Sequence, residues 1–466
     1  MKKISSLYYL VLVLFMGGLF RLSAQEQVSI ENYINLVKMY HPFVKQAQLR
    51  IDESKANLMK QRGAFDPQLI FDQKGKDFNG NSYYEKRKSQ LSIPTLYGIS
   101  IDAQRQNASG LYLDPESRID GDQLYGLGAT IELGRGLFSN PRQTALKQAK
   151  LFKEQTKEEN ALEINDILTT AAHAYLDWYK AYRSYQIFDQ FVANAAFRFE
   201  GVKKRVIIGD LAIIDSTEAR IAYNQRLLEK ENALLELRKK ALAASNFMWF
   251  ENQPVLLSDQ VEPFLEEEPF VFLFQADSLN IENHPKLRAL AYKNDQLVLE
   301  KRLQTNNLLP KFSLHYQWLS ESSPISELSY ALDPDNNITG IKAVIPLLFR
   351  KERADLKLAK IKLSDLEWEQ AQTKLALQNK LEALRVAADR LKKQEVLAKQ
   401  MVEDYNRLFE GERKKFAAGE SSLFLVKTRE SKLIEAILKS IAVEVAQKKA
   451  AVTYYYAVTF QSMAQI

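Results

Sequence analysis

The sequence contains no cysteine among its 466 residues. Disulfide bonds, thiolate metal sites, cysteine nucleophiles and a lipid-modified N-terminal cysteine are therefore excluded. Long hydrophobic runs are also scarce, because beyond the first 24 residues no stretch is apolar throughout the roughly 18 residues that a membrane-spanning helix requires. A membrane role of the remaining chain would need β-strands.

The first residues have the organisation of a secretory signal peptide. Two lysines are followed by an apolar run over residues 7–20 and then by the small pair Ser23-Ala24. Positive, apolar and small segments in this order predict a cleaved signal peptide over residues 1–24. The alternative is an uncleaved membrane anchor, but the apolar run is shorter than the roughly 20 residues that a span needs.

A strong excess of one charge sign is also missing. The chain has 64 Lys and Arg against 58 Asp and Glu, which gives a formal net charge of +6. Loss of the signal peptide would remove three basic residues and leave +3. Acidic and basic residues mostly alternate along helical stretches without forming a basic patch, so we expect no nucleic-acid partner.

Residues with catalytic or metal-binding chemistry form no recognisable constellation. The sequence has no phosphate-binding P-loop pattern, no nucleophile–base pair and no zinc motif around its four histidines. His41 and His284 each precede a proline, which favours a place at a helix start over metal ligation. We therefore expect no enzymatic activity, no catalytic residue, no metal and no cofactor.

The strongest internal signal is a repeat. Matched pairs at an offset of 243 residues are His41 and His284, Pro42 and Pro285, and Pro67 and Pro310. Matched pairs at an offset of 210 residues are Phe199 and Phe409, Glu200 and Glu410, Gly201 and Gly411, and Gly209 and Gly419. The offset falls by 33, so the first copy carries about that many extra residues between Pro67 and Phe199. The pattern predicts two copies of one structural plan.

Two long stretches are nearly free of helix-breaking residues. Residues 142–253 and 347–466 contain no proline, and each stretch has only two glycines. At 1.5 Å per residue, a helix from Pro141 to Gly209 would extend roughly 100 Å, which no compact domain can house as its core. Apolar residues at alternating steps of four and three from Leu377 to Phe409 indicate knobs-into-holes packing. The helices therefore predict a coiled-coil or tubular architecture.

Period-two alternation of apolar and polar residues marks the segments between the helices. It is clear in residues 99–104, 127–133 and 312–318, and it covers about seven residues in each. Such segments suit a soluble sheet with one buried face, or the strands of an outer-membrane β-barrel. The export signal and the long helices favour the barrel. A further alternating segment at 88–93 leaves the number of strands in the first copy open.

These features divide the chain into parts. They are a signal peptide (1–24), a first repeat (25–250), a proline-punctuated linker (251–276) and a second repeat (277–466). In the first repeat we expect helices 28–62 and 141–248 and a β segment 66–136. In the second repeat we expect helices 278–307 and 350–460 and a β-hairpin 310–346.

The two glycine-marked turns carry the most specific pattern. They are Lys204-Arg205-Val206-Ile207-Ile208-Gly209-Asp210-Leu211 and Lys414-Lys415-Phe416-Ala417-Ala418-Gly419-Glu420-Ser421. With the signal peptide and with the order of helix, β segment, long helix, turn and returning helix occurring twice, the chain resembles the TolC-like outer membrane efflux family. The resemblance covers nearly all of the mature chain. The first β segment is too long for the single hairpin per copy that is common in that family.

The resemblance implies a mainly α fold with β-barrel strands, a two-fold internal repeat, long coiled-coil helices in a periplasmic α-barrel, and outer-membrane β-hairpins in a TolC-like homotrimer. It implies a passive channel that conducts efflux or secretion substrates across the outer membrane of a Gram-negative bacterium. The partners that it implies are a periplasmic membrane-fusion adaptor protein, indirectly an inner-membrane pump of the RND or ABC type, and outer-membrane lipid. The alternative function is a periplasmic coiled-coil scaffold without a pore.

The resemblance also points to functional residues at the two turns. We expect the adaptor to dock at Gly209, Asp210, Leu211, Gly419, Glu420 and Ser421. We expect a periplasmic gate at Lys204, Arg205, Lys414 and Lys415, where ion pairs between helices would hold the mouth of the channel shut. The simpler alternative is that the glycines only allow the chain to reverse between two helices.

Overall fold

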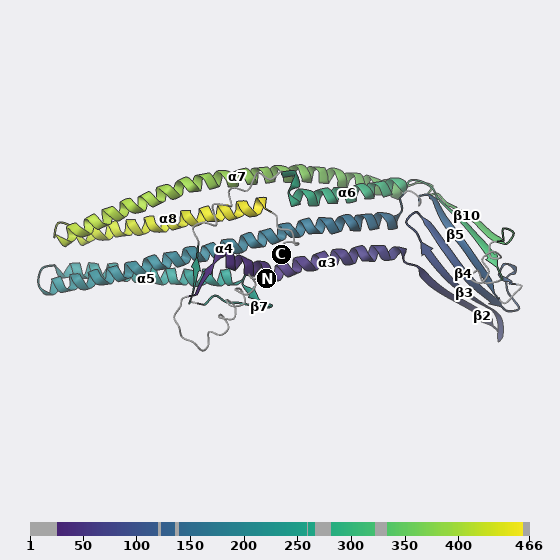
Figure 1. The fold of residues 1–466 in the computed structure, drawn as a ribbon, viewed down its shortest axis with the longest axis horizontal. Coiled ribbons are helices and arrows are strands. Elements are labelled where there is room, and N and C mark those ends of the chain that lie inside the picture. Colours follow the sequence, from purple (N-terminus) through teal and green to yellow (C-terminus); the bar gives the residue numbers. More distant parts are fainter. Residues whose placement is uncertain are drawn as a thin grey trace, which may run out of the picture.

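A computed structural model describes residues 26–119, 123–135, 139–258, 260–265, 281–321 and 333–459. The predicted signal peptide lies outside these ranges, as do the end of the predicted linker and the last residues of the chain. The molecule is a long rod in which helices run side by side and a β-sheet forms one end (Figure 1).

Helices account for most of the described residues. In the first half they are α2 (Ile30–Tyr40), α3 (Pro42–Arg62), α4 (Pro141–Ile207) and α5 (Ile213–Ser245). In the second half they are α6 (Pro285–Asn306), α7 (Arg350–Ala417) and α8 (Leu423–Val458). The pairs α4–α5 and α7–α8 each turn back at the end of the rod opposite the sheet (Figure 1). No helix in the described ranges combines the length and the apolar character needed to cross a membrane.

The predicted helix 28–62 is divided at His41. Its first residues belong to a short strand, β1 (Glu26–Ser29), and His41 has an extended backbone (φ −65°, ψ 134°) between α2 and α3. Pro42 is the cause, because its ring disfavours helical geometry in the preceding residue. The ring nitrogen Nδ1 of His41 accepts the N–H of Phe43 at 3.3 Å and so caps α3.

The second repeat starts its helix in the same way. The Nδ1 atom of His284 accepts the N–H of Lys286 at 3.1 Å, and Pro285 occupies the first turn of α6. Burial lowers the pKa of His284 to about 4, and the positive charges of Lys380 and Lys286 act in the same direction. The imidazole is therefore neutral at neutral pH and keeps a lone pair for the capping bond.

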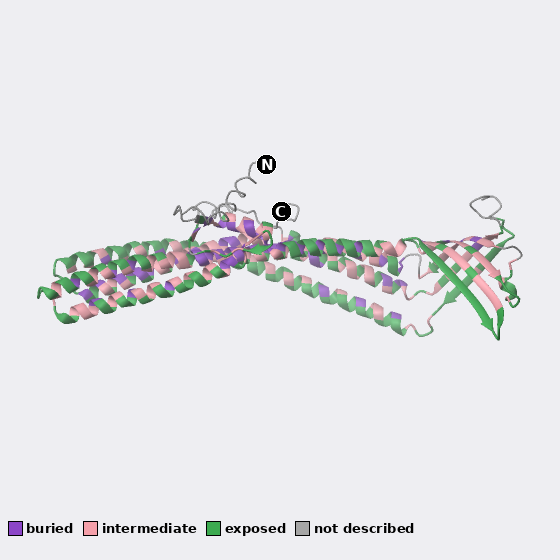
Figure 2. Cartoon of the chain, turned by 90° about the horizontal axis from the view of Figure 1, so that it is seen from below, coloured by how far each residue is buried: buried purple, intermediate pink, exposed green. Residues whose placement is uncertain are grey.

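Buried residues gather midway along the rod (Figure 2). The hydroxyl of Tyr175 lies 2.6 Å from the carbonyl oxygen of Val28 and 2.7 Å from that of Phe264. It thereby ties α4 to β1 and to its parallel partner β8 (Val261–Phe264). Tyr33 packs against Tyr175 with ring centroids 5.2 Å apart, and burial raises the pKa of both phenols. Both hydroxyls therefore remain hydrogen-bond donors. These contacts anchor β1 to α4, the longest helix of the first half.

Six antiparallel strands form the sheet, in the order β10-β9-β5-β4-β3-β2. Their bounds are β2 (Gln68–Phe78), β3 (Asn81–Pro94), β4 (Ile99–Ser109), β5 (Leu124–Gly134), β9 (Lys311–Ser320) and β10 (Asn337–Val344). The first repeat supplies four strands and the second supplies two, which accounts for the extra residues of the first copy. A two-residue hairpin of β6 (Trp249–Phe250) and β7 (Gln253–Pro254) follows α5 elsewhere in the rod.

The six strands are longer than the alternation in the sequence predicts. They hold 8 to 14 residues each, against the expected seven or so. The alternation is clean only near the helices, and the strands extend beyond it. Towards the far ends of β3 and β4, residues such as Glu85, Arg87 and Arg105 occupy the side that is apolar nearer the helices, so the period-two signal disappears while the strand continues.

The pairing register gives the sheet one polar and one apolar face. Residues that share the polar face are Asp102, Gln104, Thr130, His315 and Gln317. Residues that share the apolar face are Leu69, Leu91, Ile101, Leu127, Leu314 and Trp318. The polar side chains bond one another across strands: Gln104 Nε2 donates to Gln317 Oε1 at 2.9 Å, and Thr130 Oγ1 lies 3.0 Å from Nδ1 of His315.

Exposure on these two faces is the reverse of what a soluble sheet shows. Asp102 and Gln317 on the polar face are 8% and 3% exposed. Leu69 and Phe71 on the apolar face are 63% and 74% exposed, and Ile341 is 80% exposed. Within the described part of the chain, these apolar side chains are left uncovered, whereas polar side chains on the opposite face cover one another.

Glycine allows close approach on the polar face at one strand pair. A Cβ atom added to Gly128 of β5 would lie 2.5 Å from the carbonyl oxygen of Tyr316 and 2.8 Å from Cβ of Gln317. Real Cβ atoms do not approach backbone oxygens so closely, so β5 and β9 would have to separate locally.

We therefore predict that Gly128→Ala lowers the free energy of unfolding by about 1–3 kcal/mol, the usual cost of overpacking. Gly75→Ala is the matched control, because its added Cβ would lie an ordinary 3.7 Å from the carbonyl oxygen of Tyr84. Thermal unfolding followed by circular dichroism measures both. Equal melting temperatures for the two variants would contradict the close approach.

Candidate docking tips and a buried charge cluster

The two turns at the far end of the rod share one set of hydrogen bonds. We call residues 204–214 the first tip and residues 414–424 the second tip. In the first tip, Gly209 N–H donates to the carbonyl of Val206 at 3.1 Å, and Asp210 N–H donates to that of Arg205 at 2.9 Å. The second tip repeats both bonds at the same lengths. This pair of bonds is the Schellman ending of a helix.

Each turn depends on a glycine for its backbone conformation. Gly209 and Gly419 both have φ +80°, a region that residues with a side chain rarely enter. A Cβ atom added at either position would meet nothing within 4 Å. The glycines therefore serve to reverse the chain, as the simpler interpretation of the sequence holds, and the surface beside them is open.

The two tips differ in the apolar surface that they expose. The exposed isoleucines of the first tip are Ile207, Ile208, Ile213 and Ile214, at 71–80%. The matching residues of the second tip are Ala417, Ala418, Leu423 and Phe424. Of these, Leu423 is buried and Phe424 is 63% exposed. The four isoleucines are evident in the sequence, but their exposure could not be predicted without the geometry of the turn.

The predicted docking residues occupy different surroundings. Leu211 packs into a small apolar cluster that joins both tips and includes Val202, Ala219 and Leu423. The hydroxyl of Ser421 bonds the carboxylate of Glu412. The other predicted docking residues, Gly209, Asp210, Gly419 and Glu420, are exposed. Leu211 and Leu423 therefore hold the two turns together, while the glycines and acidic residues of the tips remain open to solvent.

The predicted gate residues form no bond between helices within one chain. Arg205 Nε donates to Asp210 at 2.6 Å, which closes its own turn. Lys204, Lys414 and Lys415 are exposed, and none has an ion pair with another described residue of the chain. Any bridge from these lysines would have to reach another molecule.

A buried charge cluster lies beside the first tip, and the sequence interpretation missed it. Glu430 of α8 is 2% exposed and lies 2.6 Å from Arg198 of α4 and 3.5 Å from Arg226 of α5. Arg226 also contacts Glu229 at 2.6 Å and donates to the hydroxyl of Ser431 at 2.8 Å. Two cations and two anions thus join three helices from both repeats.

One sequence feature could have revealed this cluster. Glu430 lies four residues after Val426 and three before Leu433, and both of these neighbours are buried. That spacing is the seam position of a coiled coil. A charge at a seam position is buried, so it requires a partner of opposite sign.

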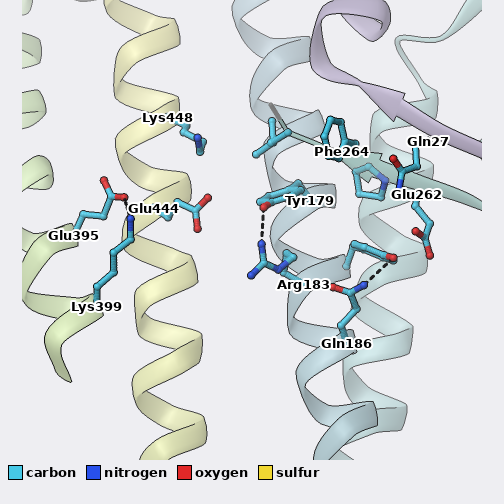
Figure 3. A pocket seen from close by; sticks show the side chains of 13 residues that line it. Gln27, Tyr179, Arg183, Gln186, Glu262, Phe264, Glu395, Lys399, Glu444 and Lys448 are labelled. Atoms are coloured by element: carbon cyan, nitrogen blue, oxygen red, sulfur yellow. Dashed lines mark hydrogen bonds and ion pairs between the residues drawn. The ribbon is translucent and has the colours of Figure 1, made fainter. Parts of the chain in front are cut away.

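A cavity of about 790 Å³ lies midway along the rod, lined by α4, α7 and α8 and by the strand pair β1 and β8 (Figure 3). Polar groups in its wall already pair with one another: Lys399 with Glu395 at 2.8 Å, and Arg183 with the hydroxyl of Tyr179 at 2.7 Å. Across the described ranges, no three His, Asp or Glu side chains come close enough together to hold a metal ion.

We predict that Glu430→Ala lowers the free energy of unfolding by about 3–5 kcal/mol, because it removes the counter-ion of the half-buried Arg198 and one of the two carboxylates that pair with the buried Arg226. Glu369→Ala is the matched control, since its 3.0 Å pair with Lys293 is about half exposed on both sides and contributes at most about 1 kcal/mol. Chemical denaturation measures both variants. A cost for Glu430→Ala no larger than that of the control would show that the cluster does not stabilise the helices.

The overall arrangement matches several solved membrane channels. No protein-family model matches the sequence, and no curated protein matches it. A membrane protein from Pseudomonas aeruginosa superimposes with a TM-score of 0.65 at 15% identity, covering 92% of each chain. The CmeC outer membrane channel of Campylobacter jejuni gives 0.64 at 12% identity, covering 93% of this chain and 86% of CmeC.

The MtrE outer membrane channel of Neisseria gonorrhoeae, in its open state, gives a TM-score of 0.63 at 13% identity over 92% of this chain and 88% of MtrE. Each of these matches covers 92% or 93% of this chain, which is more than any one element contributes. The chain therefore has the fold of the TolC-like outer-membrane channels.

Proposed function

We propose that the chain is a passive outer-membrane channel. Three copies would pool their sheets into one barrel in the outer membrane of a Gram-negative bacterium and their helices into one tube in the periplasm. Efflux or secretion substrates would pass through the tube from an inner-membrane pump to the outside. The chain itself would perform no chemical reaction and would need no cofactor.

The observation that carries this proposal is the reversed exposure of the sheet. On the central strands its polar face is covered and internally hydrogen-bonded, with Asp102 at 8% and Gln317 at 3% exposure, whereas Phe71 and Ile341 on its apolar face are 74% and 80% exposed. In water this arrangement forgoes burial of the apolar face, which is the main favourable contribution to folding. In a bilayer it is what a barrel strand requires, with apolar residues towards lipid and polar residues towards the lumen.

The edges of the sheet support assembly with further copies. All residues of edge strand β2 are exposed, and at the other edge all but one residue of β10 are exposed. Unpaired edges expose backbone donors and acceptors that cannot enter hydrocarbon unsatisfied. Pairing β2 of one copy with β10 of the next would satisfy both edges. Three six-stranded sheets would then close into a barrel of eighteen strands.

The long helix α7 supports the same assembly. Only five of its 68 residues are buried within the chain. Ile361, Trp368 and Leu375 follow one another at seven-residue spacing and are 53%, 76% and 58% exposed. A stripe at heptad spacing is what a neighbouring helix packs against in a coiled coil, so sister chains are the natural cover for this face.

The tips would lie at the periplasmic end of the tube, because they are at the opposite end of the rod from the sheet (Figure 1). We place the contact with a periplasmic membrane-fusion adaptor there, at Gly209, Asp210, Leu211, Gly419, Glu420 and Ser421. The exposed isoleucines around Gly209 add apolar surface to this contact. Through the adaptor, the channel would connect to an inner-membrane pump of the RND or ABC type.

We place the gate at the same end. Lys204, Lys414 and Lys415 are exposed and have no ion pair with any described residue of their own chain, so they can bridge to a neighbouring copy across the mouth. Each exposed bridge contributes little, typically under about 1 kcal/mol. A weakly held mouth suits a channel that opens when a partner binds, because small differential interactions then shift the equilibrium.

A periplasmic scaffold without a pore is the alternative function. It would account for the long helices, but it would leave the apolar face of the sheet in water.

Conductance distinguishes the two functions. We predict that the full-length protein, purified in detergent as a trimer, inserts into planar lipid bilayers and produces discrete single-channel currents. The closed mouth should keep the wild-type conductance low, and charge removal by Lys204→Ala with Lys414→Ala should raise it. A water-soluble monomer that produces no current would refute the channel.

We predict that Gly209→Trp abolishes export while leaving trimer assembly intact, because the indole would project into open space at the tip and block the adaptor. Gly209→Asn is the matched control, since asparagine tolerates positive φ and adds little bulk. A strain lacking the gene, complemented with each variant, is scored for sensitivity to a panel of antibiotics, detergents and metal salts. Equal resistance with tryptophan and asparagine would exclude docking at this tip.

A further inference from the structure

On β3 and β4, two arginines interrupt the apolar face of the sheet. Along β4, the residues on this face are Ile99, Ile101 and Ala103, and the next one is Arg105. Arg105 is directly opposite Ser89 of β3 and Tyr125 of β5. Beyond this point the same face carries no further aliphatic residue on β4.

A second arginine lies diagonally across from the first. Arg87 of β3 is opposite Asn107, two positions beyond Arg105 on β4, and it shares the apolar face. Diagonal neighbours on one face of a sheet are about 7–8 Å apart, within joint reach of one anion for side chains as long as arginine. Arg87 donates to Glu85 on its own strand at 2.7 Å and still has a 63% exposed side chain.

Arg105 has no partner of its own. It is exposed, and it has no hydrogen bond or ion pair with any described residue. Five donors on a guanidinium group therefore face away from the chain beside aliphatic residues. A lone cation next to hydrocarbon is costly at the centre of a bilayer and nearly without cost at its interface, where it can reach a polar headgroup.

A neighbouring copy does not reach this position in the proposed assembly. β4 lies in the interior of the sheet, with β5 and β9 and β10 on one side and β3 and β2 on the other. Contacts between copies would form at the two edge strands. The environment of Arg105 is therefore the membrane itself.

We propose that Arg105, together with Arg87, binds the phosphate group of an anionic lipid at the outer rim of the sheet. This inference rests on the proposed function, because it takes the apolar face to be turned towards lipid. Guanidinium groups bind phosphate through paired N–H donors, which gives geometry as well as charge. The aromatic ring of Tyr125 beside Arg105 suits the same depth, since tyrosine is enriched where hydrocarbon meets headgroups.

The charge balance favours phosphate over a zwitterionic surface. Two arginines and one glutamate share this part of the face, which leaves one net positive charge per copy. The lysines of β3, Lys86 and Lys88, fall on the polar face instead. The cationic site on the lipid side is therefore separate from the charges that would line the lumen.

Binding of lipid A with and without its phosphates tests the site. Native mass spectrometry of the delipidated full-length trimer measures the affinity for diphosphorylated lipid A and for the dephosphorylated form. We expect Arg105→Ala to weaken binding of the diphosphorylated form about fivefold, and Arg87→Ala with Arg105→Ala to weaken it about 25-fold. Neither change should alter binding of the dephosphorylated form. Lys88→Ala is the matched control, because it removes one charge at a similar level on the opposite face, and it should behave like the wild type.

Three results would overturn the proposal. The first is an unchanged preference for the phosphorylated form in the double variant. The second is an equal loss in the Lys88→Ala control, which would indicate only a general charge effect. The third is full competition by inorganic phosphate at about 10 mM, which would indicate binding of a free anion and not recognition of a lipid headgroup. Failure of the proposed function itself is recognised separately, because the wild-type trimer would then not insert into planar bilayers at all.

Discussion

Two unpaired edges of one sheet set the condition that the rest of the structure has to meet. A single chain provides six strands with a polar and an apolar face, but it cannot close them, since β2 and β10 lie at opposite edges. An open sheet cannot satisfy its edge backbone in hydrocarbon. Closure by sister chains solves that problem and also turns every polar face inward. The proposed membrane role and the proposed symmetry of the assembly both rest on this one requirement.

The two repeats meet this requirement unequally. The second repeat supplies one hairpin and the first supplies two, and the extra pair of strands is where the offset between the repeats changes from 243 to 210 residues. A hairpin is the natural unit of such an insertion, because adding two antiparallel strands returns the chain to the side from which it left. The helices on either side of the insertion keep their order and direction. The sheet can therefore widen while the helical rod and its tips keep their plan.

Much of this architecture could be predicted from the sequence, and the reasons differ by element. Gly209 and Gly419 mark the turns because a positive φ excludes most other residues. The positions of the two turns could therefore be predicted from the sequence alone. The place of His41 at a helix start could also be predicted. The division of the first helix at this residue was not predicted, although Pro42 disfavours helical geometry in the residue before it. Backbone constraints of this kind are local and leave a residue-level mark.

The buried charge cluster could not be predicted in the same way, because its meaning depends on three helices at once. Arg198, Arg226 and Glu430 are separated in sequence by 28 to 232 residues, and each occurs in a stretch of mixed charge that is typical of a solvated helix face. Only the packing of α8 against α4 and α5 removes them from water. The same holds for Arg105, whose proposed role comes from its exposure and from the lack of a partner among the described residues, and not from any pattern in the sequence around it.

The buried charge cluster and the exposed lysines would have different roles when the proposed channel opens at its periplasmic end. Glu430 joins the helix pairs of both repeats within one chain, and breaking such a buried pair is costly. The exposed ammonium groups of Lys204, Lys414 and Lys415 form no ion pair with the described residues, and contacts that they would form with other copies are individually weak. An opening motion would break the weaker contacts, which are those between neighbouring chains. The helices α4, α5 and α8 of each chain would then move together. In the proposed assembly, the gate would lie at the boundaries between copies, and the three helices of each copy would move there as one rigid unit.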